Sequence, residues 1–275
     1  MEARLSIDKA IVRRNRDDRY DDGRGVSEDF PNSWRFLLGR ARHALSRDEQ
    51  RIVEDMIGPV ERVSHDRVIL RDGELADRST YLIEGFMART IERDGRRHIV
   101  SMHVPGDFTD LHAFALKRLD HTVVAIGPAK VGYVPHRKLE QIVADHPHLG
   151  RMLWFSTLLD AAIHREWILT MEHLPIEGRL AHLMAELWHR LSLVRLGDED
   201  GFNLPLTQVE IADACGTTPI HLNRVVRSLR EAGIMELSRG RVTILDRPRL
   251  EQAGKFDPSY LYGEGHLKLR DELSH

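Results

Sequence analysis

Between Val60 and Val134 the apolar residues fall in short runs that turn-forming residues interrupt. Six such β-prone runs can be recognised, covering residues 67–70, 80–85, 86–92, 96–104, 121–126 and 130–134. Asp94-Gly95, between two of these runs, is typical of a tight β-hairpin, because glycine readily adopts the positive φ that the turn needs. The pattern predicts a compact antiparallel β-roll or barrel.

The segments on either side of this region have different patterns. Residues 1–32 are mostly charged, and we expect a mobile N-terminal extension there. A short helix is expected over residues 33–45, and Ser46 is a suitable N-cap for a second helix over 47–57. After the β region, the pattern predicts a helix over residues 136–146.

A longer helix is predicted over residues 148–172. One of its faces carries apolar residues at helical spacing, namely Leu149, Met152, Leu153, Leu159, Ile163 and Trp167. The first half of the helix is apolar almost all round, so it must be covered on more than one side. The β-roll and the same helix of a second copy would cover it, which predicts a symmetric dimer. The alternative is a helix buried within its own domain.

Residues 206–235 have the pattern of two short helices joined by a sharp turn. Thr207, with Glu210 three residues later, forms a capping-box pattern for the first helix. Gly216 follows where a left-handed residue would end that helix. Either threonine of Thr217-Thr218-Pro219 then caps the second helix, and the proline fits its first turn.

The second helix is amphipathic. Its thin apolar stripe consists of Leu222, Val225, Val226 and Leu229. Gly233 ends the helix, and two short strands are expected around Ser238-Arg239-Gly240. Together these elements predict a winged helix-turn-helix. The alternative is a helical hairpin and a β-hairpin of some other domain.

The polar outer face of the second helix is suited to the major groove of DNA. Arg224 can bind guanine O6 and N7, and His221 can donate to guanine or to a phosphate. Pro219 and Ile220 can contact a thymine methyl group, whereas other side chains at the helix starts and the wing tip are better placed for phosphates. We therefore predict DNA contacts from Thr207, Gln208, Thr217, Thr218, Pro219, Ile220, His221, Asn223, Arg224, Arg227 and Arg239.

Composition limits the class of protein. Of the 275 residues, 41% are hydrophobic and 30% charged, which indicates a globular chain. The net charge is −3, so a nucleic-acid surface must be local. No apolar run reaches the roughly 18 residues of a membrane helix, so no membrane partner is expected.

The chain has a single cysteine, Cys215. One cysteine excludes internal disulfides and Cys-rich metal sites within one chain, and it fits a cytoplasmic protein. The residue is interpreted as a small buried hydrophobe of the first short helix, and a redox-sensing thiol is the alternative.

In combination, these motifs resemble the Crp/Fnr family of bacterial transcription regulators. The resemblance covers roughly residues 34–246 and rests on RDGELADRSTYLIEGFM, DGRRHIVSMHVPGDF, the long helix, and the segment 206–235 with its wing. It implies an α+β protein with a cyclic-nucleotide-binding-like antiparallel β-roll, a long dimerisation helix and a C-terminal winged helix-turn-helix. It also implies a homodimer on palindromic double-stranded DNA, with RNA polymerase as a further partner, and no enzyme activity.

The resemblance divides the chain into five expected parts. These are an N-terminal extension over 1–32, a β-roll sensor domain over 33–147, a dimerisation helix over 148–174, a winged helix-turn-helix domain over 175–250 and a C-terminal tail over 251–275. Early in the recognition helix, where relatives carry Arg and Glu, this chain has Pro219 and Ile220. Only Arg224 matches a base-contacting position of the family, so we expect a different operator sequence.

The effector of the β-roll cannot be identified from the sequence. Gly106 and Asp107, with Thr122, are the candidate cassette for a cyclic phosphate. Leu119 and Asp120 stand where cyclic-nucleotide sensors carry an arginine and a small partner, and an acidic side chain repels a phosphate. We therefore expect no cAMP binding of the usual kind, and no cofactor is predicted.

The histidines suggest an alternative. His103, His112 and His121 recur nine residues apart within the predicted roll, as ligands of a metal or haem sensor or of a cupin-like metal enzyme would. Strand alternation can place them on different faces, and no tight H-x-H…E arrangement is present. We therefore predict no metal ligand set and prefer a DNA-binding regulator.

Overall fold

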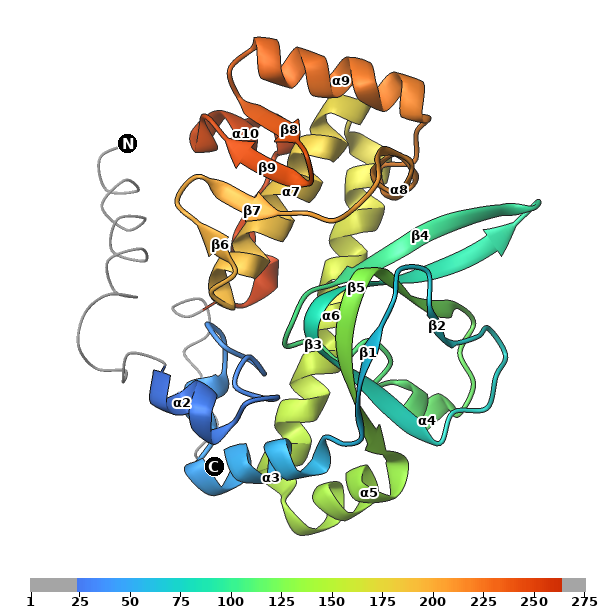
Figure 1. The fold of residues 1–275 in the computed structure, drawn as a ribbon, viewed down its shortest axis with the longest axis vertical. Coiled ribbons are helices and arrows are strands. Elements are labelled where there is room, and N and C mark those ends of the chain that lie inside the picture. The colour runs from blue at the N-terminus through green and yellow to red at the C-terminus, as the bar shows by residue number, and fades with distance from the viewer. Residues whose placement is uncertain (1–23, 264–275) are drawn as a thin grey trace.

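The structure, a computed structural model, describes residues 24–263 (Figure 1). Helix α6 (Pro147–His173) runs along much of the molecule, with the β-roll beside its lower part and the helix-turn-helix at its upper end. Most of the expected extension over 1–32 lies outside the described residues. Its last part differs from the expectation, since α2 (Arg24–Asp29) is helical and Phe30 is buried.

The roll is a five-stranded antiparallel sheet. Its strands are β1 (Val60–Val63), β2 (Val68–Leu70), β3 (Arg78–Arg93), β4 (Arg96–His103) and β5 (Thr122–Pro135). The order is β1-β5-β3-β4, and β2 also pairs with β5. The predicted antiparallel roll is confirmed. The predicted hairpin is confirmed as well, since Arg93 pairs with Arg96 and both Asp94 and Gly95 have positive φ.

The number of strands differs from the six predicted runs. Residues 80–85 and 86–92 form the single long strand β3, and residues 121–126 and 130–134 form β5. Register shifts on both sides of Glu84 and a left-handed Gly85 bend β3 without ending it. Glycine therefore marks a bend here, where the sequence pattern predicts a turn.

Short helices surround the roll. They are η1 (Arg42–Ala44), α3 (Arg47–Met56), α4 (Ala113–Leu116) and α5 (His136–Asp145). Ser46 caps α3 as predicted, and Glu49 completes a capping box. The prediction of a helix over residues 33–45 is wrong. Turns and one 3-10 turn replace it, because Leu37 and Gly39 both adopt left-handed φ.

The C-terminal module is a winged helix-turn-helix, as predicted. It contains α7 (Ile176–Leu193), β6 (Gly197–Asp198), β7 (Gly201–Asn203), α8 (Gln208–Ala214), α9 (Pro219–Glu231), β8 (Met235–Ser238) and β9 (Arg241–Ile244). The wing sheet has four strands in the order β6-β7-β9-β8, so a segment before α8 is part of the sheet, where the sequence pattern predicts a loop.

The first part of the expected tail over 251–275 is folded. Helix α10 (Arg247–Gly254) and the 3-10 turn η2 (Pro258–Leu261) follow the wing, and Phe256 and Leu261 are buried. The Arg40 Nε donates to the Leu261 carbonyl at 3.1 Å, which ties this segment to the N-terminal part of the roll domain. The part of the expected tail after residue 263 lies outside the described residues.

The roll and the helix-turn-helix share one hydrophobic core. Met102 and Ile126 of the roll belong to the same buried cluster as Leu180 of α7 and Leu222 of α9. This continuity fixes where α9 lies relative to the roll. Within residues 24–263, no helix combines the length and the apolar character needed to cross a membrane.

Candidate nucleic-acid interface

Helices α8 and α9 begin at well-defined caps. The Thr207 Oγ1 accepts the Glu210 N–H at 3.2 Å, and the Glu210 Oε2 accepts the Thr207 N–H at 2.8 Å, as the predicted capping box requires. Gly216, with φ of 64°, turns the chain after α8. Of the two possible caps of α9, the structure selects Thr218, whose Oγ1 accepts the His221 N–H at 3.3 Å.

The faces of α9 follow the predicted amphipathic pattern. Leu222, Val225 and Leu229 are buried, and Val226 is half-buried. The opposite face and the flanking caps are exposed. Among the predicted DNA-binding residues only Thr217 is half-buried, and the exposed ones are Thr207, Gln208, Thr218, Pro219, Ile220, His221, Asn223, Arg224, Arg227 and Arg239.

The wing carries its exposed cation at the tip. Arg239 and Gly240 form the left-handed turn between β8 and β9, and the Arg239 side chain extends from an exposed position. Arg241 is different, because its guanidinium lies 2.7 Å from the Asp198 carboxylate of β6. The ion pair fixes the wing sheet and leaves Arg239 as the cation of the tip.

Helix α8 is also attached to the roll, through contacts that the sequence did not reveal. The backbone N–H of Ile99, on the edge strand β4, donates to the Asp213 Oδ2 at 3.1 Å. The Arg97 guanidinium lies 3.7 Å from the buried Glu210 Oε1. In the sequence, Asp213 has the appearance of a solvated helix residue. The structure uses it to satisfy an unpaired sheet edge.

The exposed face of α6 is not the apolar face that helical spacing identified for the predicted dimerisation helix. Leu149, Met152, Leu153, Leu159 and Ile163 are buried in the protomer's own core, and the Trp167 indole donates to Glu186 of α7. The face that remains uncovered carries Trp154, Leu158 and Ile168, exposed to 65%, 51% and 69%. Helical spacing identified an apolar face but not which partner covers it.

Comparisons with known proteins identify the family of this chain. A family model described as the cyclic nucleotide-binding domain matches residues 60–146, and one described as the Crp-like helix-turn-helix domain matches residues 178–253. The transcriptional activator protein FnrL of Cereibacter sphaeroides is 30% identical over 197 residues, which cover 68% of this chain and 77% of FnrL. The chain belongs to the Crp/Fnr family of DNA-binding transcription regulators.

Solved structures agree with this Crp/Fnr fold. FixK2 from Bradyrhizobium japonicum has a TM-score of 0.63 at 21% identity, covering 71% of this chain and 96% of FixK2. A CRP-family regulator from Thermus thermophilus has a TM-score of 0.58 at 22% identity, covering 71% of this chain and 97% of the regulator. At these identities the likeness concerns the fold.

The three residues of the candidate effector cassette of this Crp/Fnr chain all make structural contacts. The Asp107 Oδ2 accepts hydrogen bonds from the Arg190 guanidinium of α7 at 2.8 Å and from the Val104 N–H at 3.0 Å. Gly106 lies against the backbone of Arg35, which a Cβ would approach to 2.6 Å. The Thr122 hydroxyl accepts the Asp72 N–H at 3.2 Å. Each of the three candidate residues therefore serves a different structural contact.

Arg190 is the centre of a buried polar network. Its guanidinium also donates to Glu186 at 3.0 Å and to the Met102 carbonyl at 2.9 Å. The Tyr260 hydroxyl donates to Glu186 at 2.8 Å. Burial lowers the pKa of Arg190, but the two carboxylates outweigh this effect and raise the pKa above its ordinary value. The network therefore joins the roll, α7 and the C-terminal segment.

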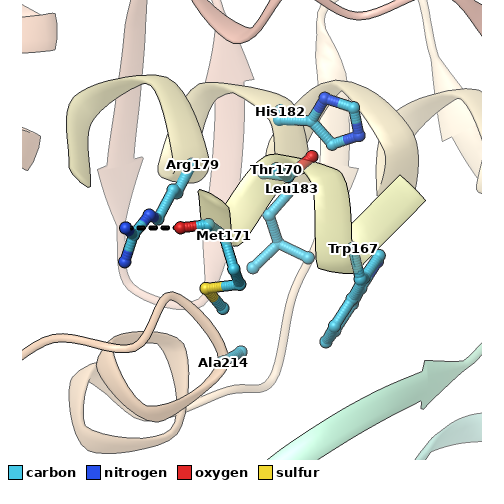
Figure 2. A pocket seen from close by; sticks show the side chains of 7 residues that line it. All are labelled: Trp167, Thr170, Met171, Arg179, His182, Leu183 and Ala214. Carbon is cyan, nitrogen blue, oxygen red and sulfur yellow. Dashed lines mark hydrogen bonds between the residues drawn. The ribbon is translucent and has the colours of Figure 1, made fainter. Parts of the chain in front are cut away.

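The junction of α6, α7 and α8 encloses a small cavity (Figure 2). Its volume of about 20 Å³ admits one water and excludes an organic effector. Trp167, Met171 and Leu183 line its apolar part, and the Arg179 guanidinium donates to the Met171 carbonyl at 2.7 Å beside it.

Cys215, at the end of α8, is a small buried hydrophobe, as predicted. Its side chain is buried, and burial raises the pKa of the thiol to about 12. Because the thiolate is the reactive form, burial lowers the reactivity of this thiol.

Proposed function

We propose that this Crp/Fnr regulator acts as a homodimer that binds a two-fold symmetric DNA site, with α9 of each protomer in the major groove. The observation that carries the proposal is the exposed outer face of α9, where His221, Asn223 and Arg224 are free of the core. Arg224 is the proposed guanine contact, and each bidentate pair contributes about 1–3 kcal/mol of discrimination.

Phosphate contacts would fix the register of the protein on the duplex. We assign these contacts to Thr207 and Gln208 at the start of α8, to Arg227 on α9 and to Arg239 of the wing. In addition, Pro219 and Ile220 are the proposed apolar contacts with thymine.

The dimer is proposed to form through the uncovered face of α6. Positions 154, 158, 161, 165 and 168 alternate in steps of four and three, which is the spacing of a coiled-coil seam. Trp154, Leu158 and Ile168 on this face are large, apolar and exposed in the protomer. A second copy of the same helix would cover them, as an isologous interface requires.

We propose that the roll does not bind cAMP in the usual way. Asp120, in the stretch where the phosphate-binding pair is expected, is a highly exposed carboxylate, and Leu119 is buried in the core. In addition, the Arg89 guanidinium, which is buried beside α6, is ion-paired with Asp160 at 2.6 Å, so its charge is already compensated and is not left for a phosphate. The proposed role is regulation of transcription in the cytoplasm with RNA polymerase as a further partner and no enzyme activity.

Selection of bound sequences from random duplex DNA tests the function. We expect wild-type protein to enrich an inverted repeat with half-sites about one helical turn apart. Enriched duplexes should lose affinity steeply as salt rises, because phosphate contacts release counterions. Enrichment of a single half-site, or of nothing, would contradict the proposal.

A further inference from the structure

Two of the three evenly spaced histidines of the roll lie side by side. His112, just before α4, and His121, just before β5, have ring centroids 5.3 Å apart with planes inclined by 41°. His103 takes no direct part, since its ring lies 3.3 Å from the Ser101 hydroxyl and 3.9 Å from Asp107. The pair comes from two segments that the fold brings together.

His121 has the hydrogen bonding and orientation of a metal-binding histidine. Its Nδ1 lies 2.9 Å from the Asp120 carboxylate, so this nitrogen carries the proton and Nε2 presents a lone pair. The residue is only 7% exposed, and within the described residues its buried Nε2 has no hydrogen-bond partner. A carboxylate that holds the far nitrogen of an imidazole is the usual outer-shell arrangement of a metal-binding histidine.

The nearest cation to the pair has its own counter-ion. The Arg89 guanidinium acts on both imidazoles, and it is ion-paired with Asp160 at 2.6 Å, so its charge is compensated.

We propose that His112 and His121 bind one transition-metal ion of the Zn²⁺ class. With Zn–N bonds of about 2.0–2.1 Å and tetrahedral angles, two ligating imidazole rings have centres about 5 Å apart, which matches the observed pair. Water or a small effector would complete the shell.

A second group of potential ligands is less suitable. Single ligand atoms of His65, Asp66 and Glu210 lie within 4.8 Å of one another. However, the Gly127 N–H donates to the His65 Nδ1 at 2.9 Å, so the proton of this imidazole resides on the Nε2 that faces the two acids. The Arg97 guanidinium already neutralises Asp66 at 3.0 Å. This group is an ion-pair network, and its histidine is a matched control.

Metal binding at this pair would be the signal that the roll receives. This regulatory part rests on the proposed function, whereas the binding site itself does not.

Zinc titration of the full chain, purified free of metal and without DNA, tests the site. We expect one Zn²⁺ per chain in the wild type, and loss of this binding in His112→Ala and in His121→Ala. Asp120→Asn should weaken binding by about 10–100-fold, because the carboxylate orients the ligand. His65→Ala and His173→Ala, which leave the pair intact, should bind as the wild type does.

A spectroscopic measurement on the wild type tests the site even if a variant does not fold. Co²⁺ in place of Zn²⁺ should give the intense visible bands of a tetrahedral site, and Zn²⁺ should raise the melting temperature. The proposal is overturned if the folded wild type shows neither effect, or if binding is lost in His65→Ala and kept in His121→Ala. Zinc binding without DNA selection would refute the proposed function alone, and DNA selection without zinc binding would refute the site alone.

Discussion

Helices α6 and α9 both present one face to the protomer and one to solvent, but the exposed faces differ in chemistry. The face of α6 carries Trp154, Leu158 and Ile168, whereas that of α9 carries His221, Asn223 and Arg224. An exposed apolar stripe lowers the free energy only when another apolar surface covers it and removes it from water. Exposed hydrogen-bond donors and cations instead bind most strongly to a polyanion such as DNA, which has acceptors at the edges of its bases.

The difference supports the proposal that the two helices have different partners and linked functions. In the proposed dimer, α6 sets the distance and symmetry between the two protomers, and α9 reads a half-site. Affinity for a full site therefore depends on both surfaces, while preference for a base pair depends on α9 alone.

The largest effect is expected from a charge in the apolar face of α6. Ile168→Glu would place an unpaired carboxylate in the dimer interface, and burying it is costly. We expect a monomer in sedimentation velocity at micromolar concentration. Affinity for the symmetric duplex should fall by about 10²–10⁴-fold, because a monomer no longer holds a second recognition helix at high effective concentration near the second half-site.

A matched control separates this effect from a change in surface charge. Leu75→Glu alters an exposed apolar residue of the roll, between β2 and β3 and outside α6. Its sedimentation and DNA affinity should stay as in the wild type. A dimeric Ile168→Glu protein would show that the exposed face of α6 is not the interface.

The next largest effect concerns base discrimination. Arg224→Ala should leave the protein dimeric and reduce its preference at one base pair of each half-site by about 1–3 kcal/mol. The readout is a second selection from random duplexes, compared position by position with that of the wild type. An unchanged motif would remove Arg224 from the role of base contact.

Arg227→Ala should have a smaller effect that depends on salt. Because Arg227 is assigned to a phosphate, its loss should weaken binding to all sequences alike. The slope of log affinity against log salt should become shallower by about 1 per protomer. Fluorescence anisotropy over a salt series measures it, and a change confined to one base pair would reassign the residue to base contact.

The two helices also differ in how far the sequence could predict them. Helix α9 is short, bounded by Thr218 and Gly233, and has a narrow stripe, so its inner and outer faces follow from spacing alone. The first half of helix α6 is apolar nearly all round. Spacing identified Leu159 and Ile163 as one face, but only tertiary packing shows that the protomer's own core covers it.

The roll shows the same limit. Its individual strand segments and the hairpin at Asp94 follow from local patterns, since each depends on neighbouring residues. The bond from Arg190 to Asp107 joins residues 83 positions apart, and nothing in the local sequence distinguishes this aspartate from a ligand contact. The pairing of His112 with His121 also needs the fold, because it depends on where two loops meet.

The smallest effect tests how firmly the start of α9 is fixed. The Thr218 Oγ1 accepts the His221 N–H, so Thr218→Ala should lower the free energy of unfolding by about 1 kcal/mol. Thr217→Ala, one residue earlier and outside the cap, should cost less, and the pair of variants differs by position alone. Urea denaturation of both variants measures the difference.

Because the cap of α9 also holds the residues that face the groove in the proposed complex, Thr218→Ala should weaken DNA binding as well, whereas dimerisation through α6 should not change. Equal stability of the two variants would show that either threonine can cap the helix, and the start of α9 would then be less rigid than the geometry indicates.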